Sequence, residues 1–219
     1  MDKPTLIYCY DAYCGWCYAF SPVIKKIFEE YSNRLEFEVL SGGMIITEKA
    51  RHVSVTAGYI QQAYKVVEEH TGIKFGPDYL WHINNPDLSD WFPSSEKSAI
   101  ALCIFKEFYP GRQIEFATDL QYALHFEGRD LTDDEAYTHL LEKYSIHPET
   151  FYTKLKSEEY KDMAYYEFAL CKQLQVTGYP AVLVQLNETK FHLLARGYTT
   201  HEEMKERIEL VLKEVLEEK

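Results

Sequence analysis

The sequence predicts an α/β fold in which two mixed units are separated by a large all-helical insertion. Three observations support this. A strand-like run near the N-terminus leads into a pair of cysteines and then into a helical pattern. The long middle of the chain has apolar residues at three- and four-residue spacing, which is typical of helices. The last third returns to strands before a final amphipathic helix. We therefore expect the order βαβ, a helical insert, and then αββα.

The first third predicts a strand, a helix and a second strand. Residues 5–10 ("TLIYCY") form a continuous β-branched and aromatic run, which indicates a buried strand. A helix should run from near Cys14 to near Asn33, with a kink at Pro22, because proline removes a backbone hydrogen bond. Its helical period comes from Phe20, Ile24, Ile27, Phe28 and Tyr31. Residues 35–44 ("LEFEVLSGGM") predict a second strand, parallel to the first and reached by a right-handed crossover.

The middle, from Thr47 to about Tyr160, has a mostly helical pattern. Thr132 or Asp133 suits the N-cap of one of these helices, because acidic residues follow in its first turn. The predicted helical segments lie near residues 55–69, 96–108, 113–126, 133–144 and 148–156. Between the first two, residues 76–95 contain three prolines and predict an irregular, aromatic-rich loop.

The last third predicts a helix, two strands and a helix. Residues 162–175 have a helical pattern. Residues 180–187 and 190–198 read as strands joined by a tight polar connection near Asn187. A C-terminal helix should start near Thr200, with one apolar face made of Met204, Ile208, Val211, Leu212, Val215 and Leu216.

Composition narrows the function. The 219 residues include 23 Lys and Arg against 35 Asp and Glu, so the net charge is −12 and opposes nucleic-acid binding. No apolar run reaches the roughly 18 residues that a membrane span needs, and the N-terminus does not resemble a secretory signal. We expect a cytoplasmic protein that binds neither nucleic acid nor membrane.

The chemistry centres on Cys14 and Cys17 in "DAYCGWCYAF". A cysteine that opens a helix faces free backbone N–H groups and the positive end of the helix dipole, both of which stabilise a thiolate. Its pKa can fall from about 8.5 into roughly the 3.5–7.5 range. Cys17 follows one turn later, where it can resolve a mixed disulfide without large backbone movement. The pair therefore predicts a redox-active disulfide with no metal and no other cofactor.

Two metal sites compete with this interpretation. A structural zinc site needs four ligands, and the chain has one CxxC and no matching histidine pair. Cys9, Cys14 and Cys17 match the start of an iron–sulfur spacing, but the fourth ligand would have to come from Cys103 or Cys171 far along the chain. We expect Cys9, Cys103 and Cys171 to be apolar core residues.

The order strand, CGWC, kinked helix, strand, followed by "VTGYPAVLV", resembles a thioredoxin fold with Pro180 in its cis-proline loop. The large helical insert resembles the DsbA-like branch of that fold. Within the insert, "PSSEKSAIALCIFKEFY" and "FEGRDLTDDEAY" resemble its FrnE-type members. The resemblance implies a discontinuous thioredoxin-like domain, residues 1–46 and 160–219, around a helical insertion domain, residues 47–159.

The resemblance also implies roles for individual residues. Cys14 would be the nucleophile and Cys17 the resolving thiol, and Pro180 would follow a cis peptide bond. Gly15, Trp16 and Tyr179 would contact substrate. The backbone of Tyr179 would lie beside the sulfurs, where an extended substrate segment could pair with it as an added strand.

The sequence departs from the family pattern at several positions. Gly15 and Trp16 replace the histidine found between the cysteines of the strongly oxidising prototype, so we expect a less oxidising couple than its value of about −120 mV. Ala181 replaces the usual threonine after the cis-proline, and Tyr8 replaces a buried acid. Asp11 could raise the thiol pKa by charge repulsion, or it could simply form the turn at the strand end.

The aromatic residues near the site leave alternatives open. Trp16 could offer an apolar surface to substrates, or it could shield Cys17 and pack on the insert. Trp81, His82 and Trp91 could line a substrate pocket, or they could fill the core of the insert. His82 would carry protons only if its loop folds over the thiols.

The function that we predict is thiol–disulfide oxidoreductase, acting on protein or small-molecule thiols and disulfides, with glutathione among the candidates. A glutathione-dependent isomerase or transferase of the same fold is one alternative, although such relatives typically have serine in place of the nucleophile. A redox-switched adaptor or binding protein is another. The direction of electron flow and the oligomeric state stay open.

Overall fold

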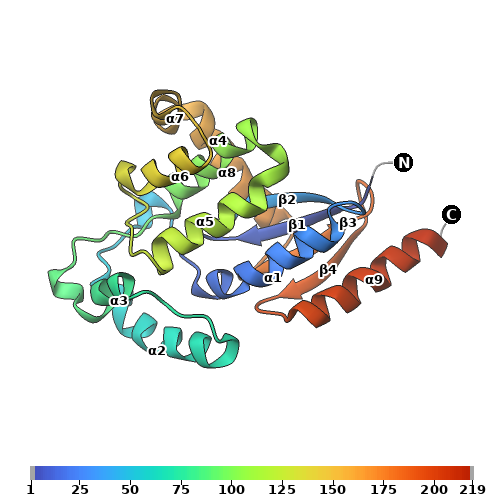
Figure 1. The fold of residues 1–219 in the computed structure, drawn as a ribbon, viewed down its shortest axis with the longest axis horizontal. Helices are drawn as coiled ribbons and strands as arrows, with labels where there is room; N and C mark the ends of the chain where they lie inside the picture. The colour runs from blue at the N-terminus through green and yellow to red at the C-terminus, as the bar shows by residue number, and fades with distance from the viewer. Residues whose placement is uncertain (1–2, 218–219) are drawn as a thin grey trace.

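The first two strands form the parallel pair that the sequence predicts. The structure, a computed structural model, describes residues 3–217, with side chains through residue 214. Within that range a four-stranded sheet has the order β2–β1–β3–β4 (Figure 1). Its strands are β1 (Thr5–Tyr10), β2 (Glu36–Ser41), β3 (Ala181–Gln185) and β4 (Phe191–Arg196). The pair β1 and β2 is parallel, and the pairs β1–β3 and β3–β4 are antiparallel.

Alternate side chains of β1 pack on the two opposite faces of the sheet. Tyr8 and Tyr10 point into the core that contains α1 (Gly15–Tyr31) and α9 (His201–Glu217). Figure 1 shows these two helices running in front of the sheet. Ile7 and Cys9 point to the other face, where they pack against α8 (Glu158–Gln173). This alternation is the period-two rule of strands, and it places both faces of the central strand in apolar surroundings.

The segment between β2 and β3 is helical, as expected. Its helices up to α7 are α2 (Ser54–Thr71), α3 (Pro77–Asn84), α4 (Ser95–Phe108), α5 (Gln113–His125), α6 (Thr138–Lys143) and α7 (Pro148–Leu155). The segment predicted near 133–144 is divided into a 3₁₀ turn, Asp134–Tyr137, and α6. Asp133 takes the N-cap position of that turn, but its side chain makes no capping hydrogen bond.

The prediction of an irregular loop over residues 76–95 is wrong in its first half, because α3 lies there. Gly76 is the extended N-cap, and Pro77 occupies the first helical turn, where its fixed φ favours a helix and its missing N–H is not needed. Tyr79 and Ile83, four residues apart, are both buried and anchor the helix. Two anchors are too few to stand out as a helical period.

Helices α1 and α9 lie close to their predicted positions, whereas α8 starts earlier than predicted. Helix α1 contains Pro22, as predicted, and ends one residue before Ser32. Helix α8 begins earlier than the sequence pattern indicates, because Ser157 caps its N-terminus through the N–H of Glu159. Helix α9 buries the first four members of its predicted apolar face, Met204, Ile208, Val211 and Leu212. The side chains of Val215 and Leu216 lie outside the described residues.

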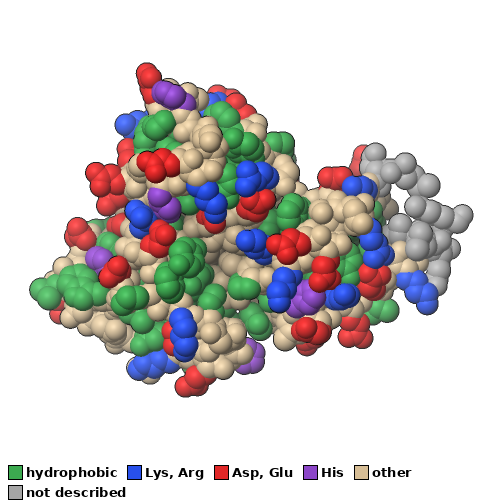
Figure 2. Space-filling model, in the orientation of Figure 1, with side chains coloured by type: hydrophobic (Ala, Val, Ile, Leu, Met, Phe, Trp, Pro, Cys, Tyr) green, Lys and Arg blue, Asp and Glu red, His purple; other side chains and the backbone are tan. Residues whose placement is uncertain are grey.

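The surface is charged but uneven. Figure 2 shows red and blue side chains over much of the visible face, with green hydrophobic side chains gathered at the end where α2 and α3 lie. Exposed apolar side chains of that region are Val55, Tyr59, Val66, Trp81, Leu88 and Phe92. Across the described part of the chain, no helix combines the length and the apolar character that crossing a bilayer requires.

Candidate active site around Cys14 and Cys17

Cys14 is the N-cap of α1, directly after the turn that ends β1. Its backbone N–H donates to the Asp11 carbonyl at 3.1 Å, and its Sγ accepts from the Cys17 N–H at 3.3 Å. The N-cap position leaves first-turn N–H groups without helical partners, and a sulfur placed there can take one of them. The side chain is only 8% exposed. Local chain geometry thus directs a backbone donor and the helix dipole at the Cys14 sulfur.

Cys17 lies one turn deeper in the molecule and is fully buried. Burial raises the pKa of its thiol well above the ordinary value, and the neighbouring Cys14 raises it further. The backbone N–H of Asp11 acts weakly in the opposite direction. Both cysteines are free thiols in the structure. Cys17 is therefore the more protected of the two sulfurs.

Tyr179 and Pro180 approach the cysteines from the other half of the chain. The peptide bond between them is cis. The Tyr179 carbonyl accepts from Cys14 Sγ at 3.5 Å, although the two residues are 165 positions apart. The Tyr179 ring lies over Gly42 and donates its hydroxyl to the Gly42 carbonyl at 3.0 Å. A Cβ on Gly42 would lie 2.1 Å from that ring, so any larger residue there would force the Tyr179 ring to move.

Asp11 connects three segments beneath the site. Its carboxylate accepts from the Tyr13 N–H at 3.0 Å, the Met44 N–H at 2.7 Å and the Ser95 hydroxyl at 2.8 Å. Burial raises the pKa of this carboxyl, and the three hydrogen bonds oppose the rise. Its charge also contributes a little to the raised pKa of Cys17. Asp11 is thus the turn former that one alternative predicted, and it also ties the start of α4 to the end of β1.

Tyr8 lies next to Cys17. Its side chain is 1% exposed, and its hydroxyl makes no regular hydrogen bond. Burial raises the pKa of this phenol well above its usual value, and the adjacent Cys17 and Cys14 raise it further. Its hydroxyl is the buried polar group that faces Cys17 from β1.

Gly15 and Trp16, which lie between the two cysteines in the sequence, make different contacts. A Cβ on Gly15 would meet the Phe75 ring at 3.3 Å, so this glycine lets Phe75 pack closely against the start of α1. The Trp16 ring is in edge contact with His70, with ring centroids 6.0 Å apart, and lies 6.2 Å from Tyr198. Trp16 therefore packs on α2, and it also faces the cavity described next.

A cavity of about 320 Å³ opens beside Cys14. The active-site turn, the segment after β2, helices α2 and α3, and Tyr179 form its walls. Its lining residues are Tyr13, Cys14, Gly15, Trp16, Met44, Ile45, Val53, Thr56, Tyr59, Ile60, Ala63, Tyr64, Val67, Phe75, Tyr79, Ile83, Trp91, Pro93, Leu124 and Tyr179. The arrangement gives a disulfide substrate a place next to the Cys14 sulfur.

The aromatic residues predicted near the site divide between the two alternatives. Trp91 is buried and lines the cavity. His82 stacks on the other side of Trp91, with ring centroids 3.9 Å apart, and shares a 2.8 Å hydrogen bond with Ser89. Burial lowers the pKa of His82. Neither His82 nor Trp81, which is 46% exposed, belongs to the cavity lining.

The other three cysteines are buried away from the cavity. Cys9 and Cys171 pack together on the opposite face of the sheet. Cys103 donates to a Glu167 carboxylate oxygen at 3.4 Å, and burial raises the pKa of its thiol. Their placement in apolar packing matches the core role that the sequence indicates.

Several contributors to the site carried no clear signal in the sequence. Phe75, Gly42 and α3 were not singled out, because their roles depend on contacts between distant segments. The face of α2 did carry a signal, since Val53, Thr56, Ile60, Ala63 and Val67 recur at three- and four-residue spacing. That period predicted the helix but not the cavity that it faces.

Comparisons with known proteins agree with this fold. The sequence matches the family described as DSBA-like thioredoxin domain over residues 5–209. None of the curated proteins compared with the chain matches it. The family match over residues 5–209 confirms the predicted thioredoxin-like fold with a helical insertion.

Solved structures with the same fold cover nearly the whole chain. One is a candidate protein disulfide isomerase from Nitrosomonas europaea, with 24% identity and a TM-score of 0.82 over 97% of this chain and 99% of that one. Another is the cytosolic disulfide reductase DsbM from Pseudomonas aeruginosa, with 23% identity and a TM-score of 0.73 over 97% and 99%. DsbM with GSH is similar at 22% identity, with a TM-score of 0.74 over 95% and 98%. The chain therefore belongs to the DsbA-like thioredoxin-domain family and, as the sequence predicted, is a thiol–disulfide oxidoreductase by class.

Proposed function

We propose that this protein exchanges disulfides through Cys14 and Cys17, with Cys14 as the nucleophile. The observation that carries the proposal is the position of the Cys14 sulfur. It accepts a backbone hydrogen bond at the start of α1 and also forms part of the wall of the 320 Å³ cavity. No external cofactor is needed, because the two sulfurs themselves exchange the electron pair.

The reaction follows from the difference between the two thiols. The Cys14 thiolate attacks one sulfur of the substrate disulfide, and the other sulfur leaves as a thiolate that takes a proton. Cys17, whose raised pKa keeps it protonated at rest, then loses its proton and attacks Cys14 Sγ. The second substrate thiol leaves, Cys14 and Cys17 become a disulfide, and two electrons have moved to the substrate. Running in reverse, the same steps oxidise a dithiol.

The residues around the sulfurs have supporting roles in this proposal. The Tyr179 carbonyl, 3.5 Å from Cys14 Sγ, holds the thiol and offers an acceptor to an extended substrate segment. Pro180 fixes the chain that presents this carbonyl. Trp16 and Gly15 bound the space in which the substrate sulfur must lie.

Partners and location belong to the same proposal. Candidate substrates are protein or small-molecule thiols and disulfides, glutathione included, and the proposed location is the cytoplasm. Support comes from DsbM, which is described as a cytosolic disulfide reductase and has been solved with GSH. The FrnE-type assignment stays a prediction from the sequence.

Insulin reduction by dithiothreitol tests the proposed function. We expect the native protein to accelerate precipitation of the insulin B chain, and we expect Cys14→Ser to abolish the acceleration. Cys103→Ser is the matched control, because it makes the same change at a buried cysteine outside the site and should leave the rate within twofold. Equal rates for the native protein and Cys14→Ser would leave only functions that do not involve redox chemistry.

A further inference from the structure

Among the residues that the structure describes, none with a charged side chain lines the cavity beside Cys14. The described residues that form its walls are aromatic or aliphatic, apart from Thr56, Gly15 and the cysteine itself. The hydroxyl of Thr56 is already donated to the Val53 carbonyl. The Tyr179 hydroxyl is likewise donated to Gly42. A bound group would therefore meet mostly apolar surface, and the other polar groups of the lining, such as the hydroxyls of Tyr13, Tyr59, Tyr64 and Tyr79, are uncharged.

Helix α2 provides most of one wall. Val53, Thr56, Ile60, Ala63 and Val67 lie three or four residues apart, so they form a single stripe that faces the cavity. Phe75, Tyr79 and Trp91 close the far side. The pocket is thus built from regular, packed elements, and its apolar character is a property of the fold.

Such a pocket discriminates against charged substrates. Glutathione disulfide carries two carboxylates and an ammonium group on each half. Placing any of them in an uncharged cavity removes hydration without supplying a partner, which is unfavourable. An aromatic or aliphatic group instead gains from the removal of its apolar surface from water.

The size of the pocket and the low exposure of Cys14 indicate how large a substrate can be. The volume of about 320 Å³ lies at the lower end of small-molecule sites, which span roughly 300–1,000 Å³. Cys14 is 8% exposed, so a small disulfide can enter more readily than a folded protein can present one.

We propose that the preferred substrate of this site is a low-molecular-mass disulfide that bears an uncharged apolar or aromatic group, and that the group occupies the cavity while Cys14 attacks. The inference rests on the proposed function and specifies its substrate class. In the first step a bond forms between Cys14 Sγ and the substrate sulfur, the substrate S–S bond breaks, and one thiol leaves. Cys17 completes the two-electron reduction as described above.

A single-turnover comparison of three disulfides tests the proposal. The reduced protein is mixed with the disulfide of N-acetylcysteine benzylamide, with glutathione disulfide, or with insulin, and loss of protein thiols is followed. Each rate constant is divided by that of dithiothreitol with the same disulfide, which corrects for intrinsic reactivity. We expect the benzylamide disulfide to be favoured at least about tenfold over both others, or about 1.4 kcal/mol.

A cation placed in the lining should remove this preference. Ala63→Lys should reduce the advantage of the benzylamide disulfide over glutathione disulfide about tenfold. Val66→Lys is the matched control, because Val66 is on the same helix but 55% exposed and outside the lining. Thr56→Lys, at an exposed backbone position on the cavity rim, serves as a second variant if Ala63→Lys does not fold.

The outcomes separate this inference from the proposed function. Equal or faster reaction with glutathione disulfide or insulin would overturn the inference and leave the exchange chemistry intact. An unchanged preference in both Ala63→Lys and Thr56→Lys would overturn the role of the cavity. No reaction with any of the three disulfides would overturn both proposals.

Discussion

The hydroxyl of Tyr8 is buried beside Cys17 without a regular hydrogen bond. A buried polar group in this state costs about 1–3 kcal/mol of stability. The same hydroxyl can donate to the Cys17 thiolate once that thiolate forms, because a charged sulfur is a better acceptor than a neutral thiol. In the proposed mechanism, Tyr8 would therefore supply a hydrogen-bond donor at the step in which Cys17 attacks.

Tyr8→Phe should separate these two effects. We expect unchanged or higher stability, because the unpartnered hydroxyl is gone. We also expect Cys17 to resolve a Cys14 mixed disulfide about tenfold more slowly, since a hydrogen bond to a charged group contributes about 1.5–3 kcal/mol. Urea denaturation and rapid-quench kinetics measure the two quantities. Lower stability with an unchanged resolution rate would make Tyr8 a purely structural residue.

His125 gives the site an acid-sensitive support. Its Nε2 lies 3.1 Å from the carbonyl of Ala12, in the active-site turn, and Nε2 therefore carries the proton. Burial lowers the pKa of His125 to about 3. The unfolded chain should titrate near 6.5, so the stabilisation is complete above about pH 6.5 and is lost as the pH falls from there toward 3.

His125→Gln should flatten this part of the pH profile, because glutamine keeps a donor but does not titrate. Between pH 7 and pH 4.5, we expect the native protein to lose about 3 kcal/mol of unfolding free energy through this residue. The variant should lose correspondingly less, as measured by urea denaturation at the two pH values. Parallel profiles for the two proteins would contradict the assignment.

At the scale of elements, Lys106 connects α4, β2 and α8. It pairs with Glu38 at 2.6 Å and with Glu167 at 2.7 Å, and it donates to the Val39 carbonyl. Glu167 also accepts from the Ser41 N–H at 2.8 Å. Burial alone would lower the pKa of Lys106, but the two carboxylates outweigh it and raise the pKa. The ammonium group therefore stays charged where the insert meets the sheet.

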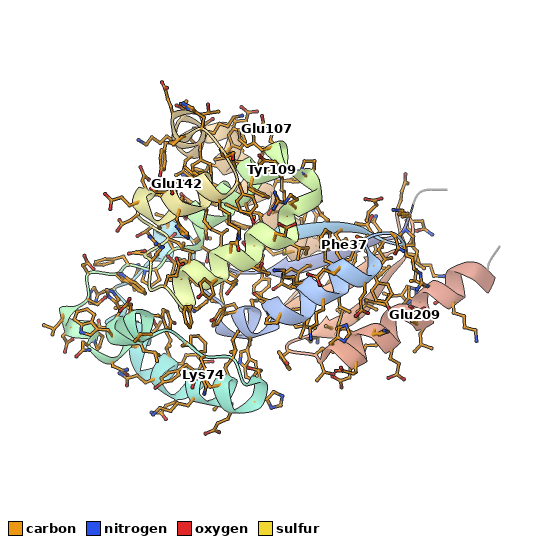
Figure 3. All side chains as sticks on the ribbon, viewed as in Figure 1. Phe37, Lys74, Glu107, Tyr109, Glu142 and Glu209 are labelled. Atoms are coloured by element: carbon orange, nitrogen blue, oxygen red, sulfur yellow. The ribbon has the colours of Figure 1, made fainter. Side chains whose placement is uncertain are left out.

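Lys106→Met should cost about 3–5 kcal/mol, because it leaves the buried Glu167 without its cation. Lys74→Met is the matched control. Lys74 pairs with Glu68 but is 69% exposed, and such pairs contribute about 0–1 kcal/mol. Figure 3 shows Lys74 beside α2, at the opposite end of the helical segment from Glu107. The free energy of unfolding of both variants is measured by chemical denaturation. Equal losses of that free energy would show that Lys106 contributes no more to stability than an exposed lysine.

Local patterns predicted most elements well, and the exceptions have physical reasons. The apolar run of residues 5–10 was sufficient to predict β1, and the helical period was sufficient to predict α1. In both cases the pattern of buried residues can be read from the segment itself. Helix α3 was missed because Pro77 looks like a helix breaker unless it occupies the first turn. Asp11 could not be resolved from the sequence, since two of its three donors, Met44 and Ser95, come from distant segments.

At the scale of the whole molecule, the cavity is what the sequence could not predict. Its walls come from seven separate parts of the chain, and the contact between Cys14 and Tyr179 spans 165 positions. Only the family resemblance placed those two residues together. The division into a domain of residues 1–46 with 160–219 and a domain of residues 47–159 stays a prediction. Hydrogen bonds such as those from Ser95 to Asp11 and from Gln113 to Phe37 connect the two predicted domains.

In the proposed mechanism, Cys14 is the sulfur that attacks the substrate. Peptide mapping of the Cys17→Ser variant after reaction with a disulfide tests this most directly, because without Cys17 the mixed disulfide cannot be resolved. We expect one adduct per chain, located on the peptide that contains Cys14, and protection of Cys9, Cys103 and Cys171. An adduct on any of those three, or none on Cys14, would contradict the central claim.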